Sequence, residues 1–334
     1  MKSVLVQILQ SVAMGTVIPG LLFTAVRNQP IPEPNKQQSI QTQQSILEQK
    51  EPYHPDVERV NVTVPVQKSD GKRKEMDLED YICRVVLGEM PASFEVEALK
   101  AQAVAARTYT LRCCLGGSKH DGDAVCTDSK CCQAYCEPEG YIRNGGTYEN
   151  VRKVFDAVME TAGQVLYYED RLIMATYFSS AGNATEDAKA VWGNSVPYLV
   201  AVSSPEGDNR YNGEKISFTA KEFQEKLGAT LKGKPESWFG AVTYTVGGGV
   251  DQIRIGGKLY KGTLLREKLG LRSTDFSVTT TDTGVTFTTN GYGHRVGLSQ
   301  YGADAMAVNG SDYEQILLHY YTGTRLGQYS PDTD

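Results

Sequence analysis

An alanine-rich segment that follows Pro91 places the strongest constraint on how this chain can fold. Pro91 ends one helix and Ser93 can cap the next, with Glu95 and Glu97 in a first turn where negative charge complements the helix dipole. Five small side chains then leave this second helix almost no bulk of its own: Ala98, Ala101, Ala103, Ala105 and Ala106. Because other elements can approach such a helix closely, we expect it to lie deep in the fold.

Glu89 ends the preceding helix and is the best general-acid candidate in the sequence. Asp77 can cap that helix, and an apolar stripe at three- and four-residue spacing then leads along one face to Glu89, formed by Leu78, Ile82, Val85 and Val86. A carboxyl group there is partly desolvated, which raises its pKa and lets it hold a proton near neutral pH. The alternative is a helix-terminal glutamate in a surface ion pair.

Length and charge leave the fold open but disfavour one class of partner. The 334 residues are enough for one large or two ordinary domains. A formal charge of −6, without dense Lys or Arg runs, argues against nucleic acid as a partner.

Residues 1–27 predict a membrane anchor, a single transmembrane helix. Residues 4–26 are uncharged and apolar, so a helix rising about 1.5 Å per residue can cross a hydrocarbon core of about 30 Å. A cleaved signal peptide is the alternative. A single anchor ahead of a large folded region usually places that region outside the cytoplasm. Residues 28–55, rich in Gln, Pro, Ser and Glu, should form a flexible linker.

Residues 56–334 are expected to form an α+β fold, a mixed helix and sheet catalytic core with an inserted, smaller α/β subdomain at about residues 207–282. In the subdomain we expect a helix at residues 220–227, a hairpin at 253–260 through Gly256 and Gly257, and a short helix at 264–269. Before the subdomain we expect an extended segment at 60–66, a helix at 147–161 and two strands within 165–178 joined at Glu169 and Asp170. After it, a strand at 285–289 should return the chain to the core. Two final helices follow, and the last opens with the capping box Ser311 and Glu314.

Six of the seven cysteines fall in one short stretch that also contains His120. Thiolates and a neutral imidazole are what tetrahedral zinc prefers, so the stretch predicts a metal-binding loop. Four protein ligands, His120, Cys126, Cys131 and Cys132, would close the site and make it structural, whereas three ligands and a water would leave a Lewis acid. A disulfide-bridged loop is the alternative, and a bridge among Cys113, Cys114 and Cys136 is compatible with zinc.

Five further sequence blocks lie in a recognisable order: E-M-P-A-S-F-E-V-E-A-L-K-A-Q-A-V-A-A-R-T-Y (residues 89–109), Y-F-S-S-A-G-N-A-T-E (177–186), V-W-G-N-S-V-P-Y-L (191–199), L-G-L-R-S-T-D-F (269–276) and G-Y-G-H-R-V-G-L-S-Q-Y-G-A (291–303). Together, over about residues 56–327, they resemble the stage II sporulation protein D family. The resemblance implies a lytic transglycosylase of spore-forming bacteria that cleaves peptidoglycan glycan strands during engulfment of the forespore. It acts between the mother cell and forespore membranes, on strands that have lost their stem peptides. The implied partners are an amidase and endopeptidase, stage II sporulation protein P, and a membrane protein, stage II sporulation protein M.

The catalytic glutamate of the family maps onto Glu89. In the family reaction the C6 hydroxyl of the sugar attacks the anomeric carbon and gives a 1,6-anhydro product, so one carboxyl group can first donate and then accept a proton. An ordinary glycosidase needs two. Eight further residues are candidates for binding the glycan: Lys100, Gln102, Arg107, Tyr177, Ser180, His294, Ser299 and Gln300. A packed, hydrogen-bonded histidine is the alternative for His294, and an ion-pair row with Glu97 is the alternative for Lys100 and Arg107.

The sequence also departs from the family pattern. Clostridial members bind zinc through a His and Cys loop, which the spacing of His120 and Cys126 matches, but Cys131 stands where a histidine ligand is expected. Asn183 and Arg295 stand where glycine is usual, which narrows the loop conformations available if those glycines need positive φ. The functional alternative is a glycan-binding or amidase-enhancing scaffold that cleaves no bond, since amidase-enhancer proteins share much of this pattern. A thiol redox protein is a weaker alternative, because the sequence has no C-x-x-C pair.

Overall fold

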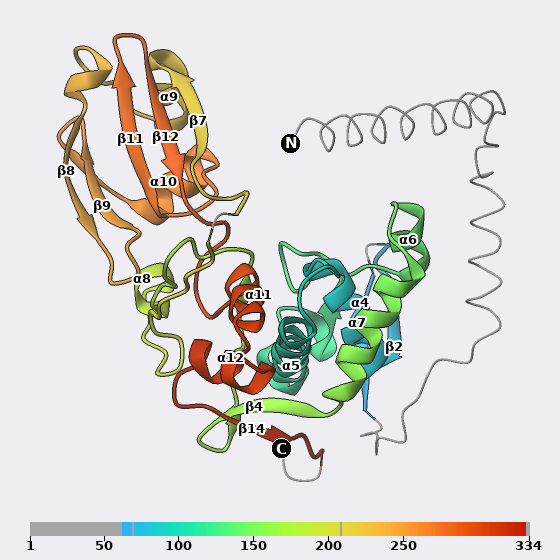
Figure 1. Ribbon diagram of the computed structural model, residues 1–334. Helices are drawn as coiled ribbons and strands as arrows, with labels where there is room; N and C mark the ends of the chain where they lie inside the picture. The colour runs from blue at the N-terminus through green and yellow to red at the C-terminus, as the bar shows by residue number, and fades with distance from the viewer. Residues whose placement is uncertain (1–61, 69, 208, 332–334) are drawn as a thin grey trace, which may run out of the picture. The chain divides into compact units, whose positions relative to one another are not determined.

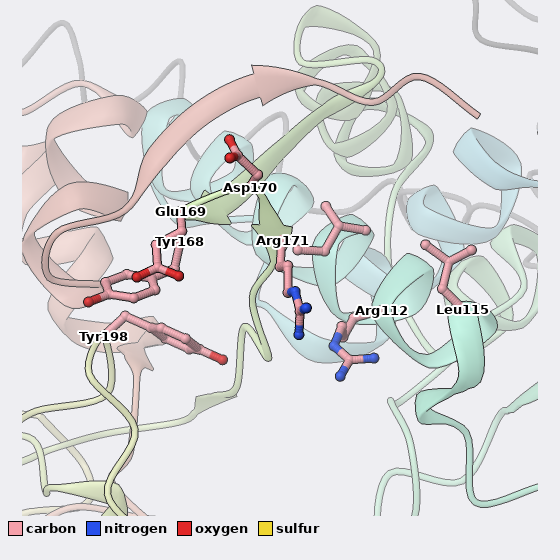
Figure 2. A pocket seen from close by; sticks show the side chains of 8 residues that line it. Arg112, Leu115, Tyr168, Glu169, Asp170, Arg171 and Tyr198 are labelled. Carbon is pink, nitrogen blue, oxygen red and sulfur yellow. The ribbon is translucent and has the colours of Figure 1, made fainter. Parts of the chain in front are cut away.

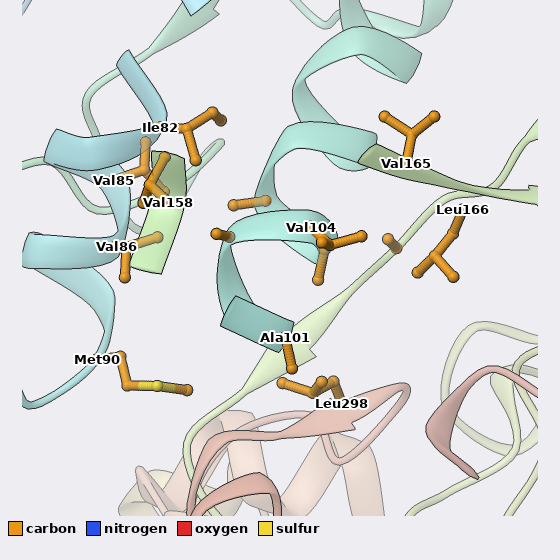
Figure 3. Close-up of a cluster of buried hydrophobic side chains, with 14 of the residues drawn as sticks. Ile82, Val85, Val86, Met90, Ala101, Val104, Val158, Val165, Leu166 and Leu298 are labelled. Carbon is orange, nitrogen blue, oxygen red and sulfur yellow. The ribbon is translucent and has the colours of Figure 1, made fainter. Parts of the chain in front are cut away.

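Helix α5 (Val96–Arg112) lies at the centre of the larger apolar core in the computed structural model, which describes residues 62–331 apart from residues 69 and 208 (Figure 1). It contacts α4 (Leu78–Glu89), α7 (Tyr148–Glu160), α11 (Gln300–Val308), α12 (Tyr313–Tyr320) and strand β4 (Gln164–Tyr168). Figure 3 shows Ala101 and Val104 of α5 among apolar side chains of neighbouring elements, including Val158 of α7. All five alanines of the predicted deep helix are fully buried, so that prediction is confirmed.

The junction between α4 and α5 confirms one predicted cap and corrects another. The Asp77 side chain accepts a hydrogen bond from the Asp80 amide and begins α4, which ends at Glu89 as predicted. Ser93 does not cap α5, because the amide of Phe94 bonds to the carbonyl of Pro91 and closes a turn first. The helix therefore begins after Glu95, whose side chain makes no capping bond.

Three small sheets belong to the core. The first sheet contains β1 (Thr63–Gln67), β2 (Arg73–Asp77) and β3 (Val125–Cys126) in the order β2-β1-β3. In the second sheet, β5 (Arg171–Leu172) and β14 (Arg325–Gln328) lie on either side of β4. The third sheet is the parallel pair β6 (Tyr177–Phe178) and β13 (Leu298–Ser299). The turn predicted at Glu169 and Asp170 joins β4 to β5. The second predicted strand is too long: it ends at Leu172, and Tyr177 and Phe178 form a separate strand that pairs with β13.

Short helices complete the core: α6 (Pro138–Arg143), α8 (Ala188–Trp192), the π-helical turn η1 (Cys113–Gly117) and the 3-10 turn η2 (Asp121–Asp123). Helix α7 confirms the predicted helix at residues 147–161, with Thr147 as its N-cap. The capping box of α12 is formed by Asp312 and Gln315, one residue later than the predicted pair Ser311 and Glu314.

A second apolar cluster forms the inserted part of the chain. Its elements are β7 (Glu214–Thr219), α9 (Ala220–Leu227), η3 (Pro235–Ser237), β8 (Phe239–Tyr244), β9 (Val250–Ile255), β10 (Lys258–Lys261), α10 (Gly262–Leu269), β11 (Phe276–Thr281) and β12 (Gly284–Thr289). Buried rings of Phe223, Trp238 and Phe287 pack within it. The predicted helix at residues 220–227 and the hairpin through Gly256 and Gly257 are both present.

Strand β12 corrects the predicted end of the subdomain at residue 282. It was expected to return the chain to the core, but it is the central strand of the sheet β11-β12-β7. Val285 and Phe287 on this strand are buried in the second cluster, so the inserted part continues to Thr289.

The predicted anchor at residues 1–27 and linker at residues 28–55 lie outside the described residues. Within residues 62–331, no helix is both long enough and apolar enough to cross a membrane.

Candidate functional site

Glu89 occupies the last position of α4, and its carboxyl group is held only by neutral groups among the residues that the structure describes. Oε1 accepts hydrogen bonds from the backbone amide of Ala134 at 2.6 Å and from the hydroxyl of Tyr177 at 3.4 Å. The side chain is half-buried. Burial raises the pKa of Glu89, and hydrogen bonds from Ala134, Tyr177 and Gln300 only partly offset that rise. The carboxyl group can therefore keep its proton to a higher pH than an exposed glutamate.

Gln133 supports this arrangement from the buried side. Its Nε2 donates to the hydroxyl oxygen of Tyr177 at 2.9 Å, and its Oε1 accepts from Thr110 of α5 at 2.8 Å. Burial raises the pKa of Tyr177 well above its ordinary value, so the phenol stays protonated and able to donate to Glu89. A hydrogen-bonded chain thus runs from α5 through Gln133 and Tyr177 to Glu89, and no sequence motif marks Gln133 for this position.

Gln300 and Gln102 lie together beside this site. Gln300, the first residue of α11, donates to the side-chain oxygen of Gln102 at 3.3 Å and also bonds to Glu89. The Nε2 of Gln102 is buried and has no partner within the described part of the chain. Of the eight predicted glycan-binding residues, Tyr177, Gln300 and Gln102 are those that the structure gathers around Glu89.

Ser180 and Ser299 are corrections to the predicted glycan-binding set. Both are fully buried and both donate to the carboxylate of Glu206, which also accepts from the amide of Ala181 at 2.7 Å. Ser299 additionally accepts from the Gly302 amide and caps α11, on which Gln300 follows. These hydroxyl groups are therefore occupied within the protein, where they fix the start of α11. Glu206 was missed because its partners are distant in sequence.

Arg107 is also a correction. Its side chain is completely buried, with Nη2 at 2.6 Å and Nε at 2.9 Å from the Glu79 carboxylate, and Nη2 donates to the carbonyl of Val158. It has no surface left for a glycan. Lys100 pairs with Glu97 at 2.8 Å and Glu160 at 2.7 Å, as in the alternative prediction of an ion-pair row. Arg107 takes no part in that row.

His294 matches the alternative prediction of a packed, hydrogen-bonded histidine. Its Nδ1 accepts from the amide of Val296 at 3.1 Å, and its ring lies 5.5 Å from Phe178 and 5.4 Å from Trp192. Burial lowers its pKa to about 4, so the imidazole is neutral near pH 7. Trp192 beside it is 45 % exposed.

Arg295 and Asn183, which stand where the family usually has glycine, differ in backbone conformation. Arg295 has a φ of 65°, a conformation that favours glycine, whereas Asn183 does not have a positive φ. The Arg295 guanidinium donates hydrogen bonds to the Glu186 carboxylate at 3.2 Å and to the carbonyl of Gly247 at 2.8 Å, and both of these hydrogen bonds are buried. Arg295 therefore ties the core to the Gly247–Gly249 loop of the inserted part, which offsets a strained backbone.

The four predicted metal ligands come together in one cluster. The ligand atoms of His120, Cys126, Cys131 and Cys132 all lie within 4.8 Å of one another, and His120 Nε2 is 3.4 Å from each of Cys131 Sγ and Cys132 Sγ. Tetrahedral zinc with bonds of about 2.0 Å to nitrogen and 2.3 Å to sulfur would separate two such ligands by about 3.5 Å. The donor set and its spacing therefore fit a closed zinc site. All seven cysteines are free thiols, so the alternative of a disulfide-bridged loop is not what the structure has.

The cluster is next to the Glu89 site in the chain. Cys131 and Cys132 are followed directly by Gln133 and Ala134, which bond to Tyr177 and Glu89 respectively. The interactions that fix Cys131 and Cys132 therefore also position the Gln133 side chain and the Ala134 amide around Glu89.

Comparisons with known proteins agree with the five sequence blocks. A family profile described as "Stage II sporulation protein" matches residues 67–168, which contain Glu89 and the four clustered ligands. The chain is 40 % identical to stage II sporulation protein D of Bacillus subtilis over 275 residues, covering 80 % of this chain and 79 % of that protein. It is 36 % identical to stage II sporulation protein D of Bacillus amyloliquefaciens, covering 93 % of this chain and 92 % of that protein. It is also 31 % identical to the amidase enhancer of Bacillus subtilis, covering 73 % of this chain and 40 % of that protein. The chain therefore belongs to the stage II sporulation protein D family, which is involved in sporulation.

Proposed function

We propose that the protein is a lytic transglycosylase that cleaves peptide-free glycan strands of peptidoglycan, with Glu89 as its single general acid and base. The observation that carries this proposal is the environment of Glu89. A half-buried carboxyl group with a raised pKa, contacted by an amide, a phenol and a carboxamide, is suited to deliver a proton near neutral pH.

In the proposed reaction, Glu89 donates its proton to the glycosidic oxygen as the bond to the anomeric carbon breaks. The C6 hydroxyl of the same sugar attacks that carbon, and the Glu89 carboxylate takes the hydroxyl proton, so the group is ready for another cycle. The hydrogen bonds from Ala134 and Tyr177 stabilise the carboxylate that exists between the two transfers. No water is added, and the product carries a 1,6-anhydro ring.

We further propose that His120, Cys126, Cys131 and Cys132 hold a structural zinc ion. Four protein ligands leave no open position for substrate, and the ion would supply folding energy to the loop. In this proposal the chain's own groups, Gln133 and Ala134, then support Tyr177 and Glu89.

The setting of this activity is proposed from the sequence. Residues 1–27 would anchor the protein in the cell membrane, with the catalytic region in the space between the mother cell and the forespore. An amidase and endopeptidase like stage II sporulation protein P would supply peptide-free strands, and a membrane protein like stage II sporulation protein M would associate with the protein.

The decisive experiment compares Glu89→Gln with Glu139→Gln, an exposed glutamate of α6. Both variants and the unaltered protein are incubated with peptide-free glycan, and products are identified by mass spectrometry. Glu89→Gln keeps the size and hydrogen bonding of the side chain but has no proton to give, so 1,6-anhydro products should disappear. Glu139→Gln should release them normally. Normal release by Glu89→Gln would reject the assignment.

A second candidate is a glycan-binding scaffold that enhances an amidase without cleaving glycan. The similarity to an amidase enhancer favours it. The same incubation separates the two, since a scaffold retains the glycan and leaves its chain length unchanged.

A further inference from the structure

A pocket of about 450 Å³ opens where α5 ends, and Glu89 does not line it. Its walls come from Arg112 and Leu115, from the turn between β4 and β5, and from Tyr198 (Figure 2). None of the activities considered so far uses these residues.

Two arginines and two acidic residues, Glu169 and Asp170, line the pocket. The Glu169 carboxylate lies beside the Tyr168 ring, away from both guanidinium groups (Figure 2). Figure 2 shows the guanidinium groups of Arg112 and Arg171 pointing into the same space. Neither makes an ion pair or hydrogen bond within the part of the chain that the structure describes. Asp170 of the same turn points away and pairs with Arg325 at 3.3 Å. Two cations that share a pocket repel each other unless an anion lies between them, and a planar guanidinium suits a carboxylate or phosphate.

Two tyrosines form the adjoining wall. The rings of Tyr168 and Tyr198 lie 5.5 Å apart at 45°, and the Tyr198 hydroxyl accepts from the amide of Met174 at 3.0 Å, which fixes that ring. Aromatic faces beside a polar group are suited to a ligand with one apolar face and one polar end. A sugar ring that bears an acid has this character, whereas a small inorganic anion has no use for the tyrosines.

We propose that this pocket binds the carboxylate of an acidic amino sugar, N-acetylmuramic acid whose lactyl group is free. The inference rests on the proposed function, because it assigns part of the same glycan substrate to this pocket. The lactyl carboxylate is negatively charged only when no peptide is attached to it through an amide. Arg112 and Arg171 would therefore favour peptide-free strands over strands that still carry peptides.

The pocket and the Glu89 site share one helix. Arg112 lies two residues beyond Thr110, which begins the hydrogen-bonded chain through Gln133 and Tyr177 to Glu89. A rigid, buried helix thus carries both the arginine and the support of the carboxyl group, which keeps the two sites in a fixed relation.

The test is a binding titration of the purified full chain, followed by NMR, with three probes: N-acetylmuramic acid, N-acetylglucosamine and glycerol phosphate. Arg112→Gln and Arg171→Gln should each weaken binding of N-acetylmuramic acid about tenfold or more, the effect of losing a charge-assisted pair. Arg143→Gln, at an exposed arginine of α6, is the matched control and should bind normally. N-acetylglucosamine should bind weakly and be insensitive to the substitutions.

Two results would overturn the proposal. One is unchanged affinity for N-acetylmuramic acid in both arginine variants, and the other is equal affinity for glycerol phosphate, which would make the pocket a general anion site. Arg112 immediately precedes η1, so its replacement can disturb folding, but Arg171 lies on an exposed edge and its variant suffices alone. Glu89→Gln should still bind N-acetylmuramic acid. If Glu89→Gln cleaves glycan normally while the arginine variants lose binding, the catalytic assignment fails and the pocket assignment stands.

Discussion

The backbone amide of Ala134 donates a 2.6 Å hydrogen bond to Oε1 of Glu89, 45 residues earlier in the chain. Because Ala134 is two residues beyond Cys132, the cysteine loop and the candidate acid form one structural unit. A neutral amide donor stabilises the carboxylate without introducing a fixed charge, and burial still keeps the pKa of Glu89 above its ordinary value.

Tyr177→Phe tests how the pKa of Glu89 controls activity. The hydrogen bond from Tyr177 lowers that pKa, so its loss should raise the pKa further. Glu89 must be protonated to act as the acid, so activity falls as pH rises through this pKa, and the alkaline limb of the profile should move to higher pH. The rate of anhydro-product release across neutral pH gives the profile. Tyr244→Phe, at an exposed tyrosine, is the control, and a limb that moves to lower pH would contradict the proposed role.

Cys126→Ser tests the metal cluster. The variant should lose the zinc that the unaltered protein is expected to carry, unfold at a lower temperature and release less product, because the loop that presents Ala134 loses a ligand. Cys136→Ser replaces a free thiol outside the cluster and should keep its metal. Elemental analysis and thermal unfolding measure the two effects. Equal zinc content in both variants would remove Cys126 from the ligand set.

Arg107→Ala tests the structural role given to this residue. It leaves the Glu79 carboxylate buried without its cation, so the free energy of unfolding should fall by about 3–5 kcal/mol. Lys100→Ala removes two more exposed ion pairs, with Glu97 and Glu160, and should cost about 1 kcal/mol or less for each pair. Urea unfolding measures both. If Arg107→Ala kept full stability and lost glycan binding, the original prediction of a glycan contact would be restored.

Arg295→Gly separates backbone strain from charge. Glycine relieves the strain at a φ of 65°, but Glu186 loses its buried partner, and the net loss of stability should be about 2–3 kcal/mol. Burial raises the pKa of Glu186 and Arg295 lowers it, so the substitution should raise it further. A raised folded-state pKa means that protonation favours the folded protein and that stability is lost as pH rises through that pKa. The loss of stability in Arg295→Gly should therefore be smaller at acidic pH than at alkaline pH.

Urea unfolding at the two pH values measures that deficit. Adding Glu186→Gln to Arg295→Gly should recover stability at alkaline pH, and the stability loss of the double variant should no longer depend on pH. A deficit that is equal at both pH values would show that Glu186 is not its source.

Local patterns predicted the helices well where one cap and one apolar stripe agreed. Asp77 begins α4 and Thr147 begins α7 as expected. Where capping residues are adjacent, as at Ser311 and Asp312, the sequence alone does not say which one turns inward, and the prediction was one residue early.

Tertiary partners account for the rest. Strand β6 forms because it pairs with β13 more than a hundred residues later, so no local pattern marks its start. Likewise the four metal ligands were found because they lie in one loop, whereas Glu206 and Gln133 have partners from distant segments. Arg107 was misassigned because a polar side chain on an alanine-rich helix suggests a cleft, and only the fold brings Glu79 to it.

The two ends of the inserted part meet. The amide of Gly291 donates to the carbonyl of Tyr211 at 3.1 Å, and the amide of Gly213 donates to Asn290 Oδ1 at 3.1 Å. A segment that leaves and rejoins the chain at one point can change length with little entropic effect on the remainder. Relatives could therefore enlarge, trim or exchange this module while the helices that carry the carboxyl group stay as they are.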